Sequence, residues 1–268
     1  MSFTKVKKGV CAAKGFVANG LNCGLNSDKN KNDLALVYSE TQCQAAAVYT
    51  TNKVKGAPIQ VTKAHLEASG HTAKAVIANS KNANTCNADG VEKAQRMCEL
   101  AAAELSIDPN EVIVASTGVI GQVLPIEPIE SHIKELAKGL SADGNDKAVN
   151  AIMTTDTVPK QYAVKFMLGD CECTVGGMAK GSGMIHPNMA TTLNFITSDV
   201  AISSELIQKA LSEIVKVTYN CLSIDGDTST NDMVSIMANG LAGNTPITTE
   251  IGRAPRLNSS HSKISYAV

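Results

Sequence analysis

Residues 74–105 read KAVIANSKNANTCNADGVEKAQRMCELAAAEL and contain the pattern that decides the fold. The apolar run at 74–78 predicts a short buried strand, and it passes directly into the polar stretch 79–89. A helix is predicted over residues 91–105, because apolar side chains recur there at helical spacing. These side chains are Val91, Ala94, Cys98, Ala101 and Leu105. A strand, a polar loop and a helix in this order predict an α/β or α+β domain.

Similar alternation continues on the C-terminal side of this stretch. Residues 111–115 predict a second strand, and a helix is predicted where apolar residues recur at 129, 133, 136 and 140. Residues 162–168 and 171–175 predict a hairpin, since Gly169-Asp170 suits a type II′ turn. Residues 191–196 predict a further strand.

Two more helices are expected near the end of this pattern. Ser203 or Ser204 is a suitable N-cap for a helix that runs to about residue 220. Its predicted apolar face consists of Leu206, Ala210, Ile214 and Val217 or Thr218. Residues 233–238 predict a shorter helix, which Asn239-Gly240 would end as a left-handed C-cap pair.

The composition is that of an ordinary globular protein. The chain has 268 residues, of which 44% are hydrophobic and 18% charged, with a formal net charge of -1. Near-zero charge, 3% aromatic residues and no Trp argue against nucleic acid as a partner. We expect one large domain or two modest ones, with a core that needs no disulfide bonds.

The cysteines and the apolar runs predict a soluble, cytoplasmic protein. Eight scattered cysteines without a secretory signal indicate free thiols in a reducing compartment. No stretch approaches the ~20 apolar residues of a membrane span. Cys171 and Cys173 form no CxxC pair, and no HxxxH occurs, so we expect no metal site and no cofactor.

The densest cluster of unusual residues is the loop 176–192, GGMAKGSGMIHPNMATT. It matches neither phosphate-binding glycine motif, and a strand follows where those motifs need a helix. A threonine at this position has another chemistry available, in which Thr191 attacks the carbonyl of Ala190 and is hydrolysed free as an N-terminal threonine. Its α-amino group, which titrates near 7.7–8.0, would then serve as its own base. On spacing alone, an ordinary β-branched strand residue is the favoured interpretation of Thr191, because threonines before strands are common.

Two further polar segments are candidates for a functional site. Residues 115–121, ASTGVIG, place a Thr117 hydroxyl beside Gly118, a pair suited to an oxyanion hole or to a simple polar turn. Residues 225–232, DGDTSTND, resemble a calcium loop superficially. Thr230 replaces the required glycine and Ile236 the required glutamate, so a polar loop that caps the helix near Met233 is predicted instead.

Taken in order, these segments resemble the ornithine acetyltransferase family of arginine biosynthesis, also called glutamate N-acetyltransferases. Six segments carry the resemblance: 51–58 (TNKVKGAP), 78–84 (ANSKNAN), 115–121, 153–157 (MTTDT), 176–192 and 225–232. They span most of residues 1–244.

The resemblance implies an α/β/β/α sandwich of the N-terminal-nucleophile type, without the family's C-terminal domain. Self-cleavage between Ala190 and Thr191 would give an α chain, 1–190, and a β chain that starts at Thr191 and continues over 191–250. Thr117 and Gly118 would form the oxyanion hole. Thr154, Lys180 and Thr191 would contact substrate.

The implied reaction moves an acetyl group from N2-acetylornithine to glutamate through an acetyl ester on Thr191. Some family members also accept acetyl-CoA as a substrate, and the quoted residues do not separate the two types. The two chains would stay associated as an α2β2 assembly. No metal, nucleic acid or membrane is implied.

The C-terminal residues depart from the family pattern. Family members continue for a further domain-sized stretch, whereas residues 251–268 contain no Asp or Glu and no apolar period. We expect a poorly ordered, unrelated tail from a truncated gene. The alternatives are a related N-terminal-nucleophile amidohydrolase or aminopeptidase, and an inactive remnant.

Overall fold

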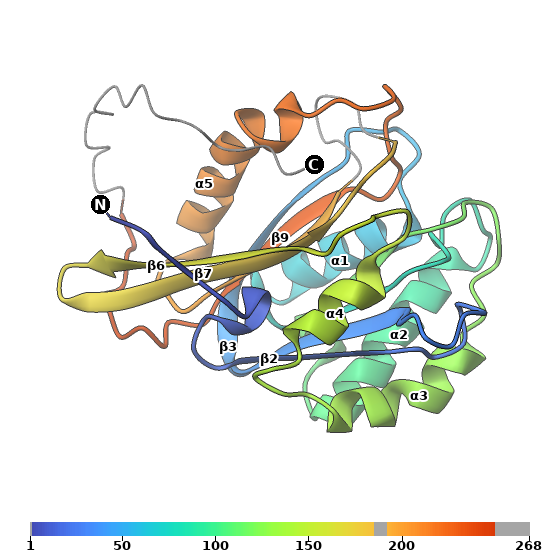
Figure 1. The fold of residues 1–268 in the computed structure, drawn as a ribbon, viewed down its shortest axis with the longest axis horizontal. Helices are drawn as coiled ribbons and strands as arrows, with labels where there is room; N and C mark the ends of the chain where they lie inside the picture. The colour runs from blue at the N-terminus through green and yellow to red at the C-terminus, as the bar shows by residue number, and fades with distance from the viewer. Residues whose placement is uncertain (1, 185–191, 250–268) are drawn as a thin grey trace.

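The computed structural model describes residues 2–184 and 192–249, which form one mixed sheet with helices on its faces (Figure 1). In chain order the elements are β1 (Thr4–Val6), η1 (Gly9–Cys11), β2 (Phe16–Leu21), β3 (Leu34–Tyr49), α1 (Ala57–Ala68), β4 (Thr72–Asn79), α2 (Gly90–Leu105), η2 (Pro109–Glu111), β5 (Val112–Ser116), α3 (Glu127–Lys138), α4 (Asn145–Ile152), β6 (Lys160–Leu168), β7 (Cys171–Lys180), β8 (Leu193–Ser198), α5 (Ser204–Lys216), η3 (Tyr219–Cys221) and β9 (Met233–Ala238).

The strand order is β1-β6-β7-β8-β9-β3-β4-β5, and β2 also pairs with β3. The pairs β4·β5 and β8·β9 are parallel, whereas the other pairs are antiparallel. This mixed sheet confirms the predicted α+β fold class. The class follows from strands that alternate with helices along the chain.

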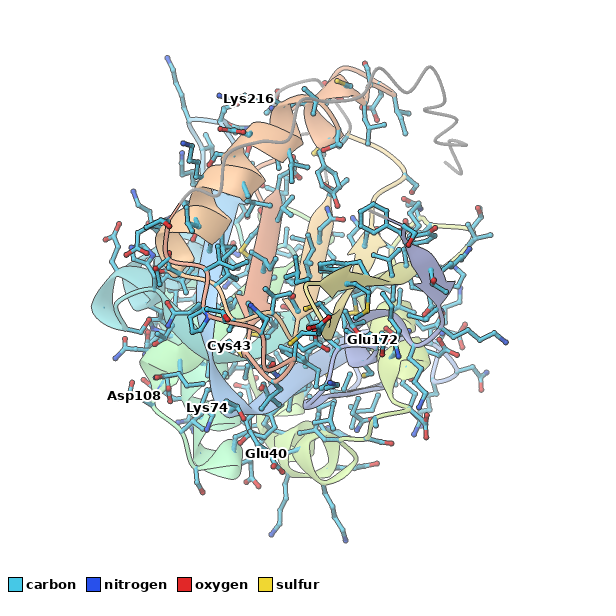
Figure 2. The ribbon with its side chains drawn as sticks, turned by 90° about the vertical axis from the view of Figure 1, so that its left-hand side faces the viewer. Glu40, Cys43, Lys74, Asp108, Glu172 and Lys216 are labelled. Atoms are coloured by element: carbon cyan, nitrogen blue, oxygen red, sulfur yellow. The ribbon has the colours of Figure 1, made fainter. Side chains whose placement is uncertain are left out.

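The long strand β3 joins two halves of this sheet. Its first half pairs with β2 and β4 and its second half with β9, and the register shifts between Tyr38 and Cys43. Figure 1 shows β2 and the start of β3 in a lower layer, with β6, β7 and β9 above them. The strand β3 bends at this register shift. Glu40 and Cys43 of β3 and Lys74 of β4 lie at the end of the molecule that contains this bend (Figure 2).

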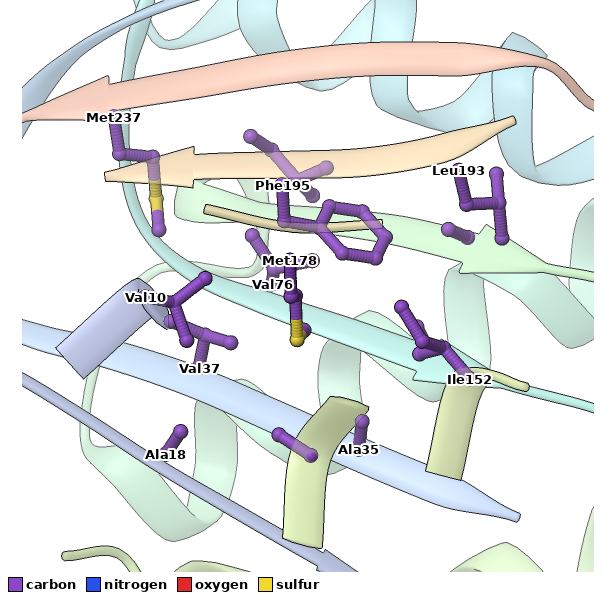
Figure 3. Close-up of a cluster of buried hydrophobic side chains, with 14 of the residues drawn as sticks. Val10, Ala18, Ala35, Val37, Val76, Ile152, Met178, Leu193, Phe195 and Met237 are labelled. Carbon is purple, nitrogen blue, oxygen red and sulfur yellow. The ribbon is translucent and has the colours of Figure 1, made fainter. Parts of the chain in front are cut away.

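The two layers enclose a central apolar core (Figure 3). Odd-numbered residues of β3 on both sides of the register shift, from Ala35 to Ala47, point into it, as strand alternation requires. Met178, Phe195 and Met237 meet them from the other layer, and α4 closes one side of the core with Ile152.

Helices cover the outer face of each layer. Leu34 and Leu36 of β3 pack with α1, α2 and α3 on one side, whereas Ala46 packs with α5 on the other. The resulting order of layers, helix, sheet, sheet, helix, is the expected α/β/β/α sandwich. In the described ranges, no helix is both long and apolar enough to cross a membrane.

Several sequence predictions are confirmed with small shifts in their ends. The strand at 74–78 is β4, the helix at 91–105 is α2, and the hairpin is β6–β7. Gly169 has φ +59° whereas Asp170 has a negative φ, as a type II′ turn requires. Val91 was expected on the buried face of α2, but it is 49% exposed.

Residues 233–238 form strand β9, so the predicted helix there is wrong. The segment MVSIMA is six residues long, and β9 lies between β3 and β8, which together pair with each of its residues. Met233 and Met237 point to the central core while Val234 points to α5. Such a short apolar run shows no clear helical or strand period, so pairing with the neighbouring strands determines that it forms a strand.

The apolar face predicted for α5 is displaced by one residue. Ser203 does cap the helix, since its hydroxyl accepts from the Leu206 amide. The buried side chains, however, are Ile207, Leu211 and Val215, whereas Ile214 is 51% exposed. Both sets have helical spacing, and contact with Ala46 and Val234 selects the observed one.

This correction predicts a contrast between two neighbouring truncations in α5. Leu211→Ala is expected to lower the free energy of unfolding by ~2–5 kcal/mol, because it removes a buried side chain. Ile214→Ala is the matched control and should cost less than ~1 kcal/mol. Urea unfolding measures both, and equal losses would contradict the assigned face.

Candidate active site

The candidate site begins where two parallel strands end side by side. Because β4 and β5 are parallel, the loops after them meet at one edge of the sheet. The amide of Thr117 donates to the carbonyl of Asn79 (3.0 Å) and that of Val119 to the carbonyl of Lys81 (3.0 Å). The amide of Ala83 donates back to Val119 (2.9 Å). These bonds hold the two loops together and fix the backbone of Thr117.

Gly118 is required by this close approach. Its φ is +137°, and a Cβ added there would lie 2.1 Å from the carbonyl carbon of Lys81. Among residues 2–184 and 192–249, its amide has no hydrogen-bond acceptor. Within the described part of the chain, it is thus a free donor beside the Thr117 hydroxyl.

Lys180, the last residue of β7, reaches Thr117 from the other layer. Its Nζ donates to Thr117 Oγ1 at 3.0 Å, and the side chain is buried. An ammonium group has no acceptor, so the Thr117 oxygen accepts and its own hydrogen stays available to donate. The contact therefore orients Thr117 as a hydrogen-bond donor next to the Gly118 amide.

Burial and charge oppose each other around Lys180. Burial lowers the pKa of its ammonium group, and the carboxylates of Asp156 and Asp232 partly offset this effect. Burial also raises the pKa of Asp232 to about 8, against the Ser229 hydroxyl, the Thr192 amide and the Lys180 charge. The site therefore holds a cation and a carboxyl group whose charges depend on each other.

Asp156 is the second carboxylate and accepts three hydrogen bonds. Its Oδ1 accepts from Lys160 Nζ (2.6 Å) and from the Gly181 amide (2.9 Å), and its Oδ2 accepts from the Thr154 amide (3.3 Å). Burial raises its pKa, but the bonds from Lys160, Gly181 and Thr154 outweigh burial and lower it overall. A charged Asp156 thus fixes both Thr154 and the residue after Lys180.

Asn231 fastens the loop 225–232 to the ends of the first layer. Its Nδ2 donates to the carbonyls of Ala83 (2.6 Å) and Ser116 (3.0 Å). Its Oδ1 accepts from the hydroxyls of Thr85 and Thr230, both at 2.6 Å. All four bonding positions of this buried amide are filled, so the loop is held rigidly against β5.

Four predicted site residues line one cavity of about 460 Å³: Thr117, Gly118, Thr154 and Lys180. A second cavity of about 390 Å³ shares Lys81 and Thr154 with it. In the described part of the chain, no three His, Cys, Asp or Glu side chains gather to hold a metal.

Ala190 and Thr191 lie outside the described residues. Their first described neighbour, Thr192, is buried, and its carbonyl accepts from the Met233 amide at 3.1 Å, beside Asp232. The register of the sheet places Leu193 opposite Lys180. The described start of β8 is therefore beside the candidate site.

Sequence reasoning missed three residues of this site: Asp156, Asn231 and Asp232. All three stand in quoted segments, 153–157 and 225–232, but the second was interpreted as a loop that caps a helix. Its aspartates were compared only with a calcium loop. A polar loop directly before a buried strand was the available signal.

The fold and this edge of the sandwich define a protein of the N-terminal-nucleophile hydrolase fold. A distant structural relative is the L-aminopeptidase D-Ala-esterase/amidase of Ochrobactrum anthropi, with a TM-score of 0.51 at 10% identity over 89% of this chain and 76% of that one. At that identity the likeness concerns the fold alone.

Within this fold the chain belongs to the ArgJ family, whose model matches residues 17–263. It is 50% identical to the arginine biosynthesis bifunctional protein ArgJ 1 of Clostridium acetobutylicum over 88% of this chain, and 49% identical to ArgJ of Bacillus subtilis over 92%. It spans 57% and 60% of the length of these two relatives.

Two solved structures are similar at higher identity. The ArgJ protein of Bacillus halodurans has a TM-score of 0.65 at 39% identity, covering 70% of this chain and 98% of that one. Ornithine acetyltransferase of Mycobacterium tuberculosis, solved in complex with ornithine, has a TM-score of 0.63 at 34% identity, covering 72% and 100%.

The close approach at Gly118 predicts a strong and local cost of substitution. Gly118→Ala is expected to lower the free energy of unfolding by ~3 kcal/mol, because the new Cβ collides with backbone and the φ is strained. Gly121→Ala is the matched control: its φ is +82° but no atom lies within 4 Å, so ~1 kcal/mol is expected. Denaturant unfolding of both variants tests this, and a similar loss in each would refute it.

The raised pKa of Asp232 predicts a dependence of stability on pH. The folded state holds the proton up to about pH 8, whereas the unfolded carboxyl loses it near 3.8, so ionisation of this group destabilises the fold as pH rises between those values. The effect is at most ~1.4 kcal/mol per pH unit. Asp232→Asn should remove this slope from unfolding free energies measured between pH 5 and 8. Parallel profiles for the two proteins would contradict the assignment.

Proposed function

We propose that this chain carries the acetyl-transferring site of an arginine-biosynthetic enzyme, which moves acetyl from N2-acetylornithine to glutamate. The observation that carries the proposal is the 3.0 Å contact between Lys180 and Thr117, beside the free amide of Gly118. The names of the ArgJ relatives and of the ornithine-bound structure support the substrate class.

The nucleophile in this proposal is Thr191. Its hydroxyl attacks the carbonyl carbon of Ala190, the peptide C–N bond breaks, and an ester links the two residues. Water then hydrolyses the ester, which leaves a carboxylate on Ala190 and a free α-amino group on Thr191. That amine, titrating near neutral pH, serves as the base for the hydroxyl of the same residue.

Acetyl transfer then takes two half-reactions. The Thr191 hydroxyl attacks the acetyl carbonyl of N2-acetylornithine, and the departing ornithine amine receives the proton that the hydroxyl gave up. The unprotonated amine of glutamate then attacks the acetyl ester, which forms N-acetylglutamate and returns a proton to the Thr191 oxygen. Each half-reaction passes through a tetrahedral oxyanion.

Thr117 and Gly118 supply the donors that such an oxyanion needs. Removal of one oxyanion-hole donor typically costs ~10²–10³ in rate. Lys180 keeps the Thr117 hydroxyl aimed as a donor and supplies positive charge for a substrate carboxylate. Thr154 lies on the wall of the same cavity, which supports its proposed contact with the substrate.

The first test is the intact mass of the purified 28.0 kDa chain. Transfer assays follow, in which N2-acetylornithine is the acetyl donor and glutamate or water the acceptor. A further assay uses acetyl-CoA as the donor and glutamate as the acceptor. We expect two fragments whose masses sum to the precursor plus one water, and acetyl transfer to glutamate in preference to water. Thr191→Ala should abolish cleavage and transfer, whereas Thr191→Ser, which keeps a hydroxyl, should retain both in part.

Three outcomes would count against this function. Full transfer by the Thr191→Ala variant would overturn the covalent mechanism. Acetyl passing to water alone would favour the amidohydrolase alternative, and an uncut chain without transfer would favour the inactive remnant. Acetylation of glutamate from acetyl-CoA would identify the bifunctional type.

A further inference from the structure

The second cavity, of about 390 Å³, opens beside the candidate active site and has a mostly amide and ammonium lining. Its walls include Asn26, Asn30, Asn32, Lys31, Lys81 and Asn150. It shares Lys81 and Thr154 with the cavity that contains Thr117 and Lys180. A ligand whose reacting end lies at Thr117 can therefore reach Lys81, which lines both cavities.

The loop that forms one wall of this cavity, residues 22–33, is held in place by hydrogen bonds. Asn26 donates its amide to the buried carboxylate of Asp33 at 2.6 Å, and Asn32 donates its side-chain amide to the carbonyls of Gly20 and Lys147, both at 3.2 Å. Asn22 donates to the carbonyl of Asn26 (3.2 Å) as well. The cavity wall is thus fixed before a ligand arrives.

The cavity has a positive charge balance. Its one carboxylate, Asp156, is 1% exposed and is fully engaged by Lys160, Gly181 and Thr154. Lys31 has only a loose 3.9 Å ion pair with Asp28. Lys81 is exposed and has no ion pair with any described residue. The lining therefore suits an anionic group, and Lys81 is its cation without an ion pair among the described residues.

The backbone of Lys81 is held in an unfavourable conformation at this junction. Its φ is +75°, a left-handed value that costs a non-glycine residue ~1–2 kcal/mol. Its carbonyl accepts from the Val119 amide at 3.0 Å, and its backbone packs directly against Gly118. Lys81 therefore belongs to the wall of the oxyanion site, and packing alone would favour a residue with a lower conformational cost at this position.

We propose that Lys81 binds the side-chain carboxylate of a dicarboxylic amino-acid acceptor, and so selects glutamate over uncharged analogues. The inference rests on the proposed function for the identity of the acceptor. A dicarboxylic acceptor has two carboxylates, and the proposed function gives one of them to Lys180, whose ammonium group also donates to Thr117. Lys81 supplies the second cation, on the wall that the cavity of Thr117 shares with the second cavity.

The test is calorimetric binding of glutamate and of glutamine, its neutral isostere, to the full chain. Unaltered protein is expected to bind glutamate at least tenfold more tightly than glutamine. Lys81→Gln should reduce this ratio to near one, whereas Lys134→Gln, which removes one charge on the exposed side of α3, should leave it unchanged. Lys81→Arg should restore most of the preference.

A second variant separates the binding role from a structural one. Lys81→Gly relieves the left-handed strain, so it should raise Tm while it removes the preference for glutamate. A Lys81→Gln or Lys81→Gly protein that still prefers glutamate would refute the inference, as would unaltered protein with no preference.

The binding data, together with the acetyl-transfer assay, distinguish this inference from the proposed function. A preference for glutamate that depends on Lys81, without acetyl transfer to glutamate, would uphold the binding site and refute the transferase. Acetyl transfer to glutamate with an unchanged binding ratio in the Lys81 variants would do the reverse.

Discussion

The bend of β3 is the constraint on which the rest of the structure depends. One strand contributes to both layers of the sandwich, and its odd-numbered residues face the central core on either side of the register shift. Because the sheet folds back on itself there, the end of β7 returns to the end of β5. The contact between Lys180 and Thr117 joins residues 63 positions apart in the chain, and it is possible only because both layers converge at this edge.

Charged side chains are buried where the two layers of the sandwich meet, and their contacts orient the residues of the site. A buried ammonium group is costly unless it has partners, so Lys180 depends on the Thr117 hydroxyl and on the carboxyl groups of Asp156 and Asp232. Lys160 holds Asp156, and the start of β8 contacts Asp232 through the Thr192 amide. Thr117, Lys180 and Asp156 are thus each oriented by a second polar group of the site. Such mutual support gives a preorganised site its defined geometry.

Much of the fold could be predicted, because the signals were local. The turn at Gly169-Asp170, the N-cap at Ser203 and the strand before residue 79 depend on neighbouring residues, and all three are confirmed. Errors arose where local signals were balanced. The run 233–238 lacks a decisive period, and two faces of α5 have equal helical spacing, so contacts with β3, β8 and β9 decided both. Asp156, Asn231 and Asp232 were missed for the same reason, since their roles depend on partners distant in sequence.

The sequence alone determined the fold class, the family and the identity of four residues that line the cavity. Glycine-rich loops and strand ends with hydroxyl side chains can be recognised as short sequence motifs. Only the tertiary structure decided that Lys180 donates to Thr117, that Gly118 must lack a side chain because of the Lys81 backbone, and that Lys81 stands between two cavities. Spacing along the chain specifies which groups are available. The distances, burial and charges between them arise only when the bend in β3 brings the two layers together.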